Sequence, residues 1–534
     1  MSTPRILSWD RQTVLVAGFA ACLSVASFLY YFRHNDILLY GDAVAHINIA
    51  RRVFDSRTPG PLQLGTVWLP LPHLLMMPFL LSGWMWRTGL GGSIPSMVAY
   101  VFGAVGIFRL TRNALLTSQP SNHATVAAWV AASAYAANPN LIYLQYTAMT
   151  ESLYLALFIW AMVYFVEFIR KAPTSNATAV KCGLCLLAAC LSRYDGWLLA
   201  AAMCGAVVFA AIKSGHQARK IIALAAAGPI FWLLYNTAIY RNPLEFANGP
   251  YSAKAIELKT STPGTPPHPG TANPAVAAQY VLKAAELNMT NRQWLQRLWL
   301  IAAIAGSLLC ISPTLWPLLL LWIPLLFYAL SIAYGGVPLF LPAWWPFSHY
   351  NLRYGLELLP ALAIFSALAV QFLAGKIRNT NYQRAFVLVL CALAGVSYVS
   401  IVHDPVCFRE AWINSRTRIA IEKELAAYLR ELPQNSTMLM YLGDHVGALQ
   451  QAGISLRRVI NEGNHRVWKQ PYDPDGLWER ALVSPEKYVD YVIAFEGDAV
   501  SSGINKANLK PIKLIDVSGQ ARATIYGAHA PLSE

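Results

Sequence analysis

Charged side chains are scarce in this sequence. Asp, Glu, Lys and Arg make up 13% of the 534 residues, whereas hydrophobic residues make up 56%. A soluble domain carries about 25% charged residues, so a wholly soluble enzyme of this length is excluded. A polytopic membrane protein is expected instead, because unpaired charge in hydrocarbon is costly. The mean hydropathy of +0.40 and the seventeen tryptophans, a residue type suited to membrane interfaces, agree with this.

The sequence also lacks a disulfide framework and a signal for removal of its first apolar run. All cysteines except Cys407 lie in or at the edge of apolar runs. Cys182 and Cys185 fall inside a predicted helix in lipid, where thiolate chemistry is not expected. The run 13–32 is long for a signal peptide and has no small-residue cleavage site. We therefore expect it to stay as the first membrane-spanning helix.

Apolar runs of about 17–25 residues predict membrane-spanning helices. Eleven are expected, at 12–32, 93–110, 124–142, 150–169, 180–192, 197–213, 220–240, 298–311, 314–333, 352–374 and 385–402. The apolar segment 67–85 contains Pro70, Pro72 and Pro78, which disfavour a regular spanning helix. We expect it to lie along the outer surface or to be re-entrant.

Acids are absent from four short loops that are rich in basic residues. The positive-inside rule places these loops, and the N-terminus, in the cytoplasm. The basic residues are Arg109 and Arg112; Arg170, Lys171 and Lys181; Lys213, Arg219 and Lys220; and Lys376, Arg378 and Arg384. The alternate loops, 33–92, 143–150, 193–196, 241–297 and 334–351, are then expected outside, together with the C-terminus. The net charge of +14 is interpreted as membrane sidedness, with no nucleic-acid partner.

The last part of the chain is predicted to form a soluble domain. A transmembrane domain is expected over 1–402, with a first external loop at 33–92 and a large one at 241–297, followed by an external α/β domain over 403–534. That domain should contain a helix at 409–432 and strands at 437–443, 457–460, 488–495, 512–517 and 523–527. The segment 262–274, rich in Pro, Gly and Thr, predicts a mobile external loop.

Charged and polar groups gather in the predicted external loops. Asp42 and His46 are four residues apart, on one face if this stretch is helical. The other groups are Glu151, Arg193, Asp195, His349, Arg353 and Glu357. Plainer interpretations stay open: Asp42 as a solvated acid, Arg353 as a helix anchor and His73 as a packed histidine. Asp42 and His46 could bind a divalent metal, but two ligands do not define a site, so no metal or other cofactor is expected.

Five stretches in this order resemble the C-type membrane glycosyltransferases (GT-C). The likeness is to the branch of the protein O-mannosyltransferases and the lipid A aminoarabinose transferase, and it covers roughly 10–402. The stretches are "GDAVAHINIARRVFDS", "VWLPLPHLLMMPF", "YTAMTESLYLALF", "RNPLEFANGPYSA" and "HYNLRYGLELLPALAI". Mannosyltransferases carry two adjacent acids in the first loop. Here Ala43 follows Asp42, so the acceptor type stays open.

The resemblance implies a polyprenyl-phosphate sugar donor and an inverting transfer to a hydroxyl of a glycan, lipid or protein. The first-loop acid would be the base, on the outer face of a prokaryotic inner membrane. The residues carried over are Asp42 and Glu151 for catalysis, Arg353, His349 and Arg193 for the donor phosphate, and His46, Asp195 and Tyr354 for the substrate. Two rivals remain. A transporter would show midplane polar groups and repeated halves, and no repeat is visible. A membrane scaffold or sensor would work through its C-terminal domain.

Overall fold

The computed structural model describes residues 10–116, 121–170, 176–210, 215–260, 264, 266–464 and 474–528. Lys171 and Lys213 of the basic loops lie outside the described residues, as do positions 262, 263 and 265 of the predicted loop 262–274. By its internal packing the chain forms two compact units. Unit 1 contains Met1–His34, Ser96–Trp232 and Pro250–Glu410; unit 2 contains Asn35–Pro95, Leu233–Gly249 and Ala411–Glu534.

This grouping differs from the predicted division near residue 402. That division separates a membrane region from a C-terminal domain, whereas packing joins residues 35–92 of the predicted first external loop to the C-terminal domain. The two segments lie at opposite ends of the chain, and hydropathy carries no information about their contact. The membrane region and the C-terminal sheet are therefore each recognisable from sequence, but the composition of unit 2 is not.

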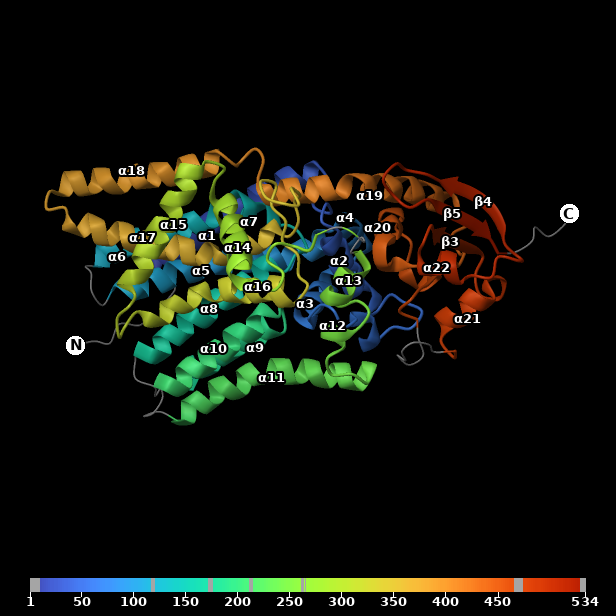
Figure 1. Ribbon diagram of the computed structural model, residues 1–534, viewed down its shortest axis with the longest axis horizontal. Helices are drawn as coiled ribbons and strands as arrows, with labels where there is room; N and C mark the ends of the chain where they lie inside the picture. Colours follow the sequence, from blue (N-terminus) through green and yellow to red (C-terminus); the bar gives the residue numbers. More distant parts are fainter. Residues whose placement is uncertain are drawn as a thin grey trace. The chain divides into compact units, whose positions relative to one another are not determined.

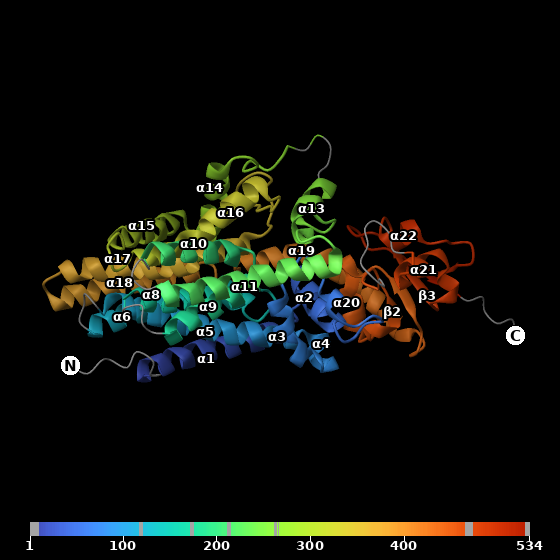
Figure 2. The same cartoon turned by 90° about the horizontal axis from the view of Figure 1, so that it is seen from below.

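Unit 1 is helical (Figures 1 and 2). It contains α1 (Arg11–Arg33), α6 (Ser121–Ala136), α7 (Pro139–Leu144), α8 (Glu151–Arg170), α9 (Asn176–Cys190), α10 (Asp195–Ala210), α13 (Ala253–Thr260), α14 (Pro274–Met289), α15 (Gln293–Leu309), η2 (Trp316–Trp322), α16 (Ile323–Tyr334), η3 (Leu352–Leu358), α17 (Leu359–Lys376) and α18 (Thr380–Val399). Most of α5 (Leu90–Leu115) and α11 (Gly215–Tyr240), and the first turn of α19 (Val406–Glu431), also belong to it.

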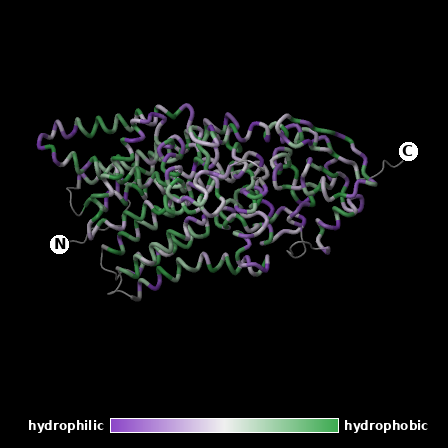
Figure 3. The backbone as a smooth tube through the Cα atoms, viewed as in Figure 1, coloured by the Kyte–Doolittle hydropathy of each residue, from purple (hydrophilic) through white to green (hydrophobic). Residues whose placement is uncertain are grey.

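The interior of unit 1 is built around α17, which packs against α15 and α6. Most of the residues of α17 are buried. By contrast, α18 buries only Ser397 and Tyr398, and its length is mainly apolar (Figure 3). An apolar helix surface that the protein leaves uncovered suits contact with lipid, because lipid tails are themselves apolar.

Seven helices are long and apolar enough to cross a membrane in the part of the chain that the structure describes. They are Arg11–Arg33, Leu90–Leu115, Glu151–Ile169, Gln217–Tyr240, Trp316–Tyr334, Leu352–Lys376 and Thr380–Val399. The fold class, a polytopic helical membrane protein with a small C-terminal α/β domain, is confirmed. The expected count of eleven spans is not reproduced. The other four predicted spans contain shorter helices, α6, α9, α10 and α15, of 15–17 residues.

Local chemistry explains one of these short helices. The predicted span 124–142 is broken after Ala136, because Asn138 caps a new helix, α7, by accepting hydrogen bonds from the amides of Asn140 and Leu141. Pro139 then occupies the first position of α7, where its missing N–H costs nothing. The segment 67–85 likewise forms two short helices, α3 (Pro70–Leu80) and α4 (Gly83–Thr88).

Unit 2 combines short helices with a five-stranded sheet. Its helices are α2 (Gly41–Arg52), η1 (Pro61–Leu64), α3, α4, α12 (Glu245–Asn248), most of α19, α20 (Leu442–Ala452), η4 (Leu456–Arg458), α21 (Leu477–Val483), η5 (Pro485–Lys487) and α22 (Ala499–Gly503). Its strands are β1 (Met438–Met440), β2 (Val459–Ile460), β3 (Tyr491–Phe495), β4 (Lys510–Ile515) and β5 (Ala523–Gly527), in the spatial order β2-β1-β3-β5-β4.

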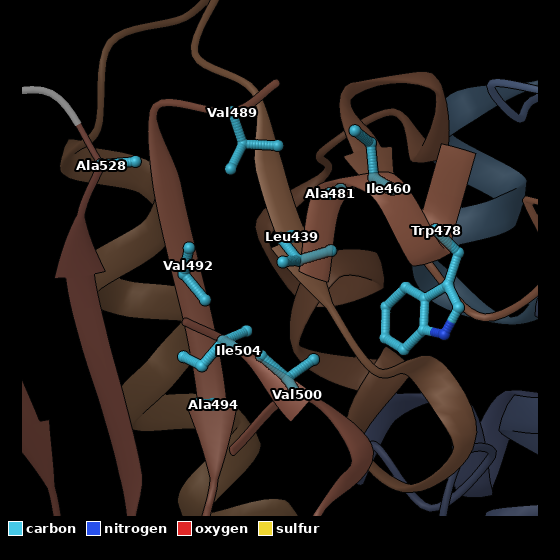
Figure 4. Packing of buried hydrophobic residues seen from close by; sticks show 10 residues of the cluster. All are labelled: Leu439, Ile460, Trp478, Ala481, Val489, Val492, Ala494, Val500, Ile504 and Ala528. Carbon is cyan, nitrogen blue, oxygen red and sulfur yellow. The ribbon is translucent and has the colours of Figure 1, made fainter. Parts of the chain in front are cut away.

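The sheet is mixed. β1 pairs in parallel with β2 and β3, whereas β5 pairs antiparallel with β3 and β4. Apolar side chains around Leu439 and Val492 form its core, together with Trp478 of α21 (Figure 4). All five predicted strands are present, although the first is shorter than expected because the chain turns into α20 at Leu442. Pro511 lies on the exposed edge strand β4, the position where a missing N–H is tolerated.

Candidate functional site

Two arginines and four carboxyl groups form one cluster in unit 1. They come from the start of α8, the turn before α10 with the first residue of that helix, helix η3 and the N-terminal part of α19. The members are Glu151, Arg193, Asp195, Arg353, Glu357 and Glu410. Three of the four segments carry residues that were selected from the sequence, namely Glu151, Arg193 with Asp195, and Arg353 with Glu357. The fold therefore brings together residues that lie far apart along the chain.

Arg193 is held on three sides. Its Nη1 donates to Glu151 Oε1 over 3.1 Å and to Thr150 Oγ1 over 2.8 Å, and its Nε donates to Asp195 Oδ2 over 3.2 Å. Its Nη2 donates to the hydroxyl of Tyr328, which in turn donates to Asp195 Oδ2 over 3.0 Å. Charge-assisted hydrogen bonds of this kind are stronger than neutral ones, so the guanidinium group has a fixed orientation.

Arg353 shares one carboxylate with Arg193. Its Nε donates to Glu151 Oε1 over 3.1 Å, and its Nη1 donates to Glu410 Oε1 over 3.2 Å. The other oxygen of Glu410 accepts from the backbone amide of Leu352, over 2.6 Å. Glu151 thus bridges two guanidinium groups, while Glu410 holds both the side chain of Arg353 and the backbone next to it.

Glu357 differs from the other acids of the cluster. Its side chain is fully buried, and neither of its oxygens has a hydrogen-bond partner among the described residues. The nearest guanidinium nitrogen is Arg193 Nε, 3.8 Å from Oε1. Four carboxyl groups therefore face two guanidinium groups, and Glu357 is the one held without hydrogen bonds. Burying a carboxylate without such bonds is costly.

Aromatic rings enclose the two arginines. The centroid of the Tyr354 ring lies 5.6 Å from Arg193 Cζ and 5.2 Å from Arg353 Cζ. The same ring stacks on Tyr328, with centroids 4.6 Å apart. A ring face beside a guanidinium group is attractive. Tyr354, expected to contact the substrate, is thus part of the packing that holds both arginines.

His349 experiences a different set of charges. Arg409 and Asp404, which form an ion pair of 2.6 Å, both act on it. Burial lowers the pKa of His349 below its usual value and Arg409 lowers it further, whereas Asp404 acts in the opposite direction. The net effect favours the uncharged imidazole. It can donate a hydrogen bond to a phosphate oxygen, but it does not bring the positive charge of an imidazolium group.

Asp42 and His46 lie on helix α2 in unit 2, one turn apart. Asp42 is half-buried in the first turn of the helix. His46 is buried, and its Nδ1 lies 2.9 Å from His73 Nε2 on α3. The ring of Trp68 lies against it, with centroids 4.6 Å apart. The expected placement of both side chains on one helix is present, and His73 is a buried partner of His46.

The C-terminal domain holds α2 directly. Asn48 donates to Gln450 Oε1 over 2.7 Å and accepts from Trp86 Nε1 over 3.0 Å, and Gln450 Nε2 donates to the carbonyl of Trp86 over 2.8 Å. These three residues, one each from α2, α4 and α20, close a ring of hydrogen bonds. Further hydrogen bonds connect residues 55–63 with residues 455–464. They join Ser455 to Asp55, Asn464 to Ser56 and Thr58, and Gln63 to the carbonyl of Gly463.

Two other features bear on the chemistry. No group of three or more His, Cys, Asp or Glu suited to a metal ion occurs among the residues that the structure describes. An apolar cavity of about 660 Å³ lies in unit 1 between α6, α15, α17 and α18. Its lining includes Trp129, Trp299 and Tyr398 but no acidic or basic side chain. It suits a hydrocarbon chain and has no group for proton transfer.

Part of this arrangement was expected from the sequence. Glu151, Arg193, Asp195, Arg353 and Tyr354 come together in unit 1, whereas Asp42 and His46 belong to unit 2. Glu410 was not selected, although an acid at the start of the helix predicted at 409–432, a few residues after the last apolar run, was a usable signal. Tyr328 was missed because a tyrosine inside an apolar run looks like an ordinary interface residue.

The fold is that of a known membrane transferase. The chain is similar to the crystal structure of ArnT from Cupriavidus metallidurans bound to undecaprenyl phosphate, with a TM-score of 0.57 and 12% identity over 97% of this chain and 99% of that one. Apo ArnT from the same organism gives a TM-score of 0.51 and 14% identity, with the same coverage. No protein-family model matches the sequence, and no curated protein matches it.

ArnT is a lipid A aminoarabinose transferase of the GT-C type, so the expected resemblance is confirmed at the level of the fold.

Proposed function

We propose that this chain transfers a sugar from a polyprenyl-phosphate donor to a hydroxyl acceptor. The observation that carries the proposal is the likeness to ArnT bound to undecaprenyl phosphate, which extends over nearly the whole of both chains. The positions of the acids and arginines of this chain supply the residue roles. Donor, acceptor and bilayer are the proposed partners, with no nucleic acid.

The proposed reaction has one nucleophile and one leaving group. The acceptor oxygen attacks the anomeric carbon, the bond from that carbon to the phosphate oxygen breaks, and the configuration inverts. The acceptor hydroxyl loses its proton to Asp42, and polyprenyl phosphate leaves with one additional negative charge. A positioned carboxylate suits this role because a hydroxyl becomes a good nucleophile only as its proton is removed. Asp42 is half-buried at the start of α2, in the first turn of that helix.

Arg353 and Arg193 are the proposed cations for the donor phosphate. Fixed cations in a water-poor site stabilise developing negative charge strongly. Both side chains are oriented in advance by carboxylates, above all by Glu151, which accepts from each of them. The acids of the cluster also repel an incoming phosphate. We therefore propose that each arginine binds the phosphate through the part of its guanidinium group that faces the donor. His349 would contribute a neutral hydrogen bond.

Substrate contacts are proposed for His46, Asp195 and Tyr354. Asp195 and Tyr354 lie in the arginine cluster, whereas His46 lies on α2, one turn after Asp42. Sugar hydroxyls are recognised by side chains that both donate and accept, which suits these residue types. Glu151 is proposed to orient the arginines, with the role of base as its alternative.

The alternative functions are those of a transporter and of a membrane scaffold or sensor. A transporter would place its polar groups at the membrane midplane between repeated halves, whereas this chain has no visible repeat. A scaffold or sensor would not need the buried ion cluster of unit 1, which costs desolvation energy. We further propose that the protein lies in a prokaryotic inner membrane with its C-terminal domain on the outer face.

The test is consumption of lipid-linked sugar by the purified protein. The protein in nanodiscs is incubated with a panel of undecaprenyl-phosphate monosaccharides and a cell-envelope extract as the source of acceptor. Release of undecaprenyl phosphate is then measured against empty nanodiscs. We expect at least one donor to be consumed with transfer of its sugar. Failure of every donor in the panel, in protein that is folded, would contradict the proposed function.

A further inference from the structure

Arg418 binds the backbone of the residues just before α2. It lies on the part of α19 that belongs to the C-terminal domain. Its Nη2 donates to the carbonyl oxygens of Leu38 and Leu39, over 3.0 and 2.9 Å. These are the last carbonyls before Tyr40, the N-cap of α2, and Asp42 follows two residues later. One charged group therefore binds two adjacent backbone oxygens at the point where the helix begins.

The guanidinium group is itself held from the other side. Its Nη1 donates to Glu422 Oε2, one turn further along α19, over 2.7 Å. The carboxyl group of Glu422 is buried, and α20 comes so close that a Cβ atom on Gly447 would lie 2.3 Å from Glu422 Oε2. A side chain at position 447 would therefore displace the Glu422 carboxylate. The position of Arg418 is thus fixed by the C-terminal domain.

We propose that Arg418 is a positioning residue for Asp42. The C-terminal domain then forms part of the catalytic machinery, because it sets the direction in which α2 leaves the preceding segment and so aims the Asp42 carboxylate. This inference rests on the proposed function and assigns a role to the segment Ala411–Glu534, which supplies none of the six residues of the acid–arginine cluster. Arg418 acts through Asp42 and does not take part in the proton transfer.

The geometry makes lysine a poor substitute at this position. A lysine ammonium is a single point of charge, whereas the Arg418 fork contacts two carbonyls with one nitrogen and a carboxylate with another. Arg418→Lys should keep the charge but lose the simultaneous contacts. A small displacement of a catalytic group costs rate more than it costs substrate binding.

The experiment compares Arg418→Ala and Arg418→Lys with Arg416→Ala, using the donor that the wild-type protein consumes fastest. Arg416 lies on the same helix, is exposed and stacks on Trp412, so its removal is matched in charge. We expect Arg418→Ala to lower kcat by about 10- to 100-fold, with the KM for donor changed by no more than about twofold. Arg418→Lys should fall between Arg418→Ala and wild type, and Arg416→Ala should match wild type. Equal kcat values for Arg418→Ala and Arg416→Ala would overturn the proposal.

A double variant separates positioning from general support of the fold. If Arg418 acts through Asp42, Arg418→Ala should cause no further loss of turnover in an Asp42→Asn background. A full additional loss would overturn the inference. Should Asp42→Asn have wild-type turnover, the role of Asp42 as base fails, whatever Arg418 does.

When the turnover of Asp42→Asn is no higher than the background rate, amide hydrogen exchange tests the positioning role of Arg418. The amides of residues 38–46 should then exchange faster in Arg418→Ala than in Arg416→Ala. Equal exchange in the two variants would contradict the positioning role.

Discussion

Arg353 donates from its Nε to Glu151 Oε1 over 3.1 Å, and that same oxygen accepts a second bond of 3.1 Å from Arg193. Glu151 is thereby the common partner of two buried arginines, and Glu357 lies close by without hydrogen bonds. The two acids should respond differently to loss of charge. Removing Glu151 leaves two guanidinium groups poorly paired, whereas removing the charge of Glu357 takes away a buried carboxylate that no donor satisfies.

Glu151→Gln should therefore destabilise the protein by about 2 kcal/mol or more, and Glu357→Gln should change stability by less than about 1 kcal/mol or even raise it. The comparison is made by thermal unfolding of both variants in the same detergent. Equal losses in the two variants would show that charge pairing does not organise this cluster.

Arg353→Lys tests the proposed phosphate contact. Lysine keeps the charge but cannot reproduce the planar fork that meets Glu151 and Glu410. We expect both Arg353→Lys and Arg353→Ala to weaken binding of undecaprenyl phosphate by about 10-fold or more, measured with labelled lipid in nanodiscs, since loss of a charged hydrogen bond costs about 1.5–3 kcal/mol. Undecaprenol, which lacks the phosphate, is the control ligand. Wild-type affinity in Arg353→Ala would leave Arg353 with a structural role only.

The C-terminal domain carries a buried histidine whose protonation should weaken it. His445 stacks on Phe495, with centroids 4.2 Å apart, and burial lowers the pKa of His445 to about 4, with a further contribution from Arg418. The unfolded chain binds this proton with a pKa of about 6.5, so between pH 6.5 and 4 it holds more protons than the folded chain. Stability from this residue is complete above pH 6.5 and is lost as the pH falls towards 4.

His445→Gln lacks that titration. The apparent Tm of the wild-type protein should therefore fall more steeply than that of His445→Gln between pH 7 and pH 5, by an amount equivalent to about 2 kcal/mol at pH 5. Parallel curves for the two proteins would contradict a neutral, buried His445.

Some features were predictable from the sequence because they depend on local pattern. The eight-residue run 488–495 predicts β3, and the apolar run 352–374 predicts the helix formed by η3 and α17. Glu151 and Arg193 could be selected because charge beside apolar runs is rare. Their shared contact could not be predicted, since it depends on how α8 and the turn before α10 pack. The hydrogen bonds from Arg418 to Leu38 and Leu39 could not be predicted either, because every residue has a backbone carbonyl and the sequence does not distinguish those that accept a bond.

The sidedness of the C-terminal domain is open to direct measurement. The basic loops predict that the C-terminus lies outside. A reporter active only in the periplasm, fused after Glu534, should be active, and a reporter active only in the cytoplasm should be silent. A cytoplasmic signal would contradict the predicted scheme of eleven spans and would change the side of later loops relative to Asp42.

The most direct test of the central claim is the turnover of Asp42→Asn. Asparagine keeps the size and shape of the side chain but cannot accept the proton. Loss of a general base costs about 10²- to 10⁴-fold in rate, so donor consumption should fall by that factor while undecaprenyl phosphate still binds. Glu151→Gln, checked for folding, is measured beside it as the other candidate base. If Asp42→Asn retains more than about a tenth of wild-type turnover, less loss than a general base accounts for, while Glu151→Gln is inactive, Asp42 is not the base and the account is wrong.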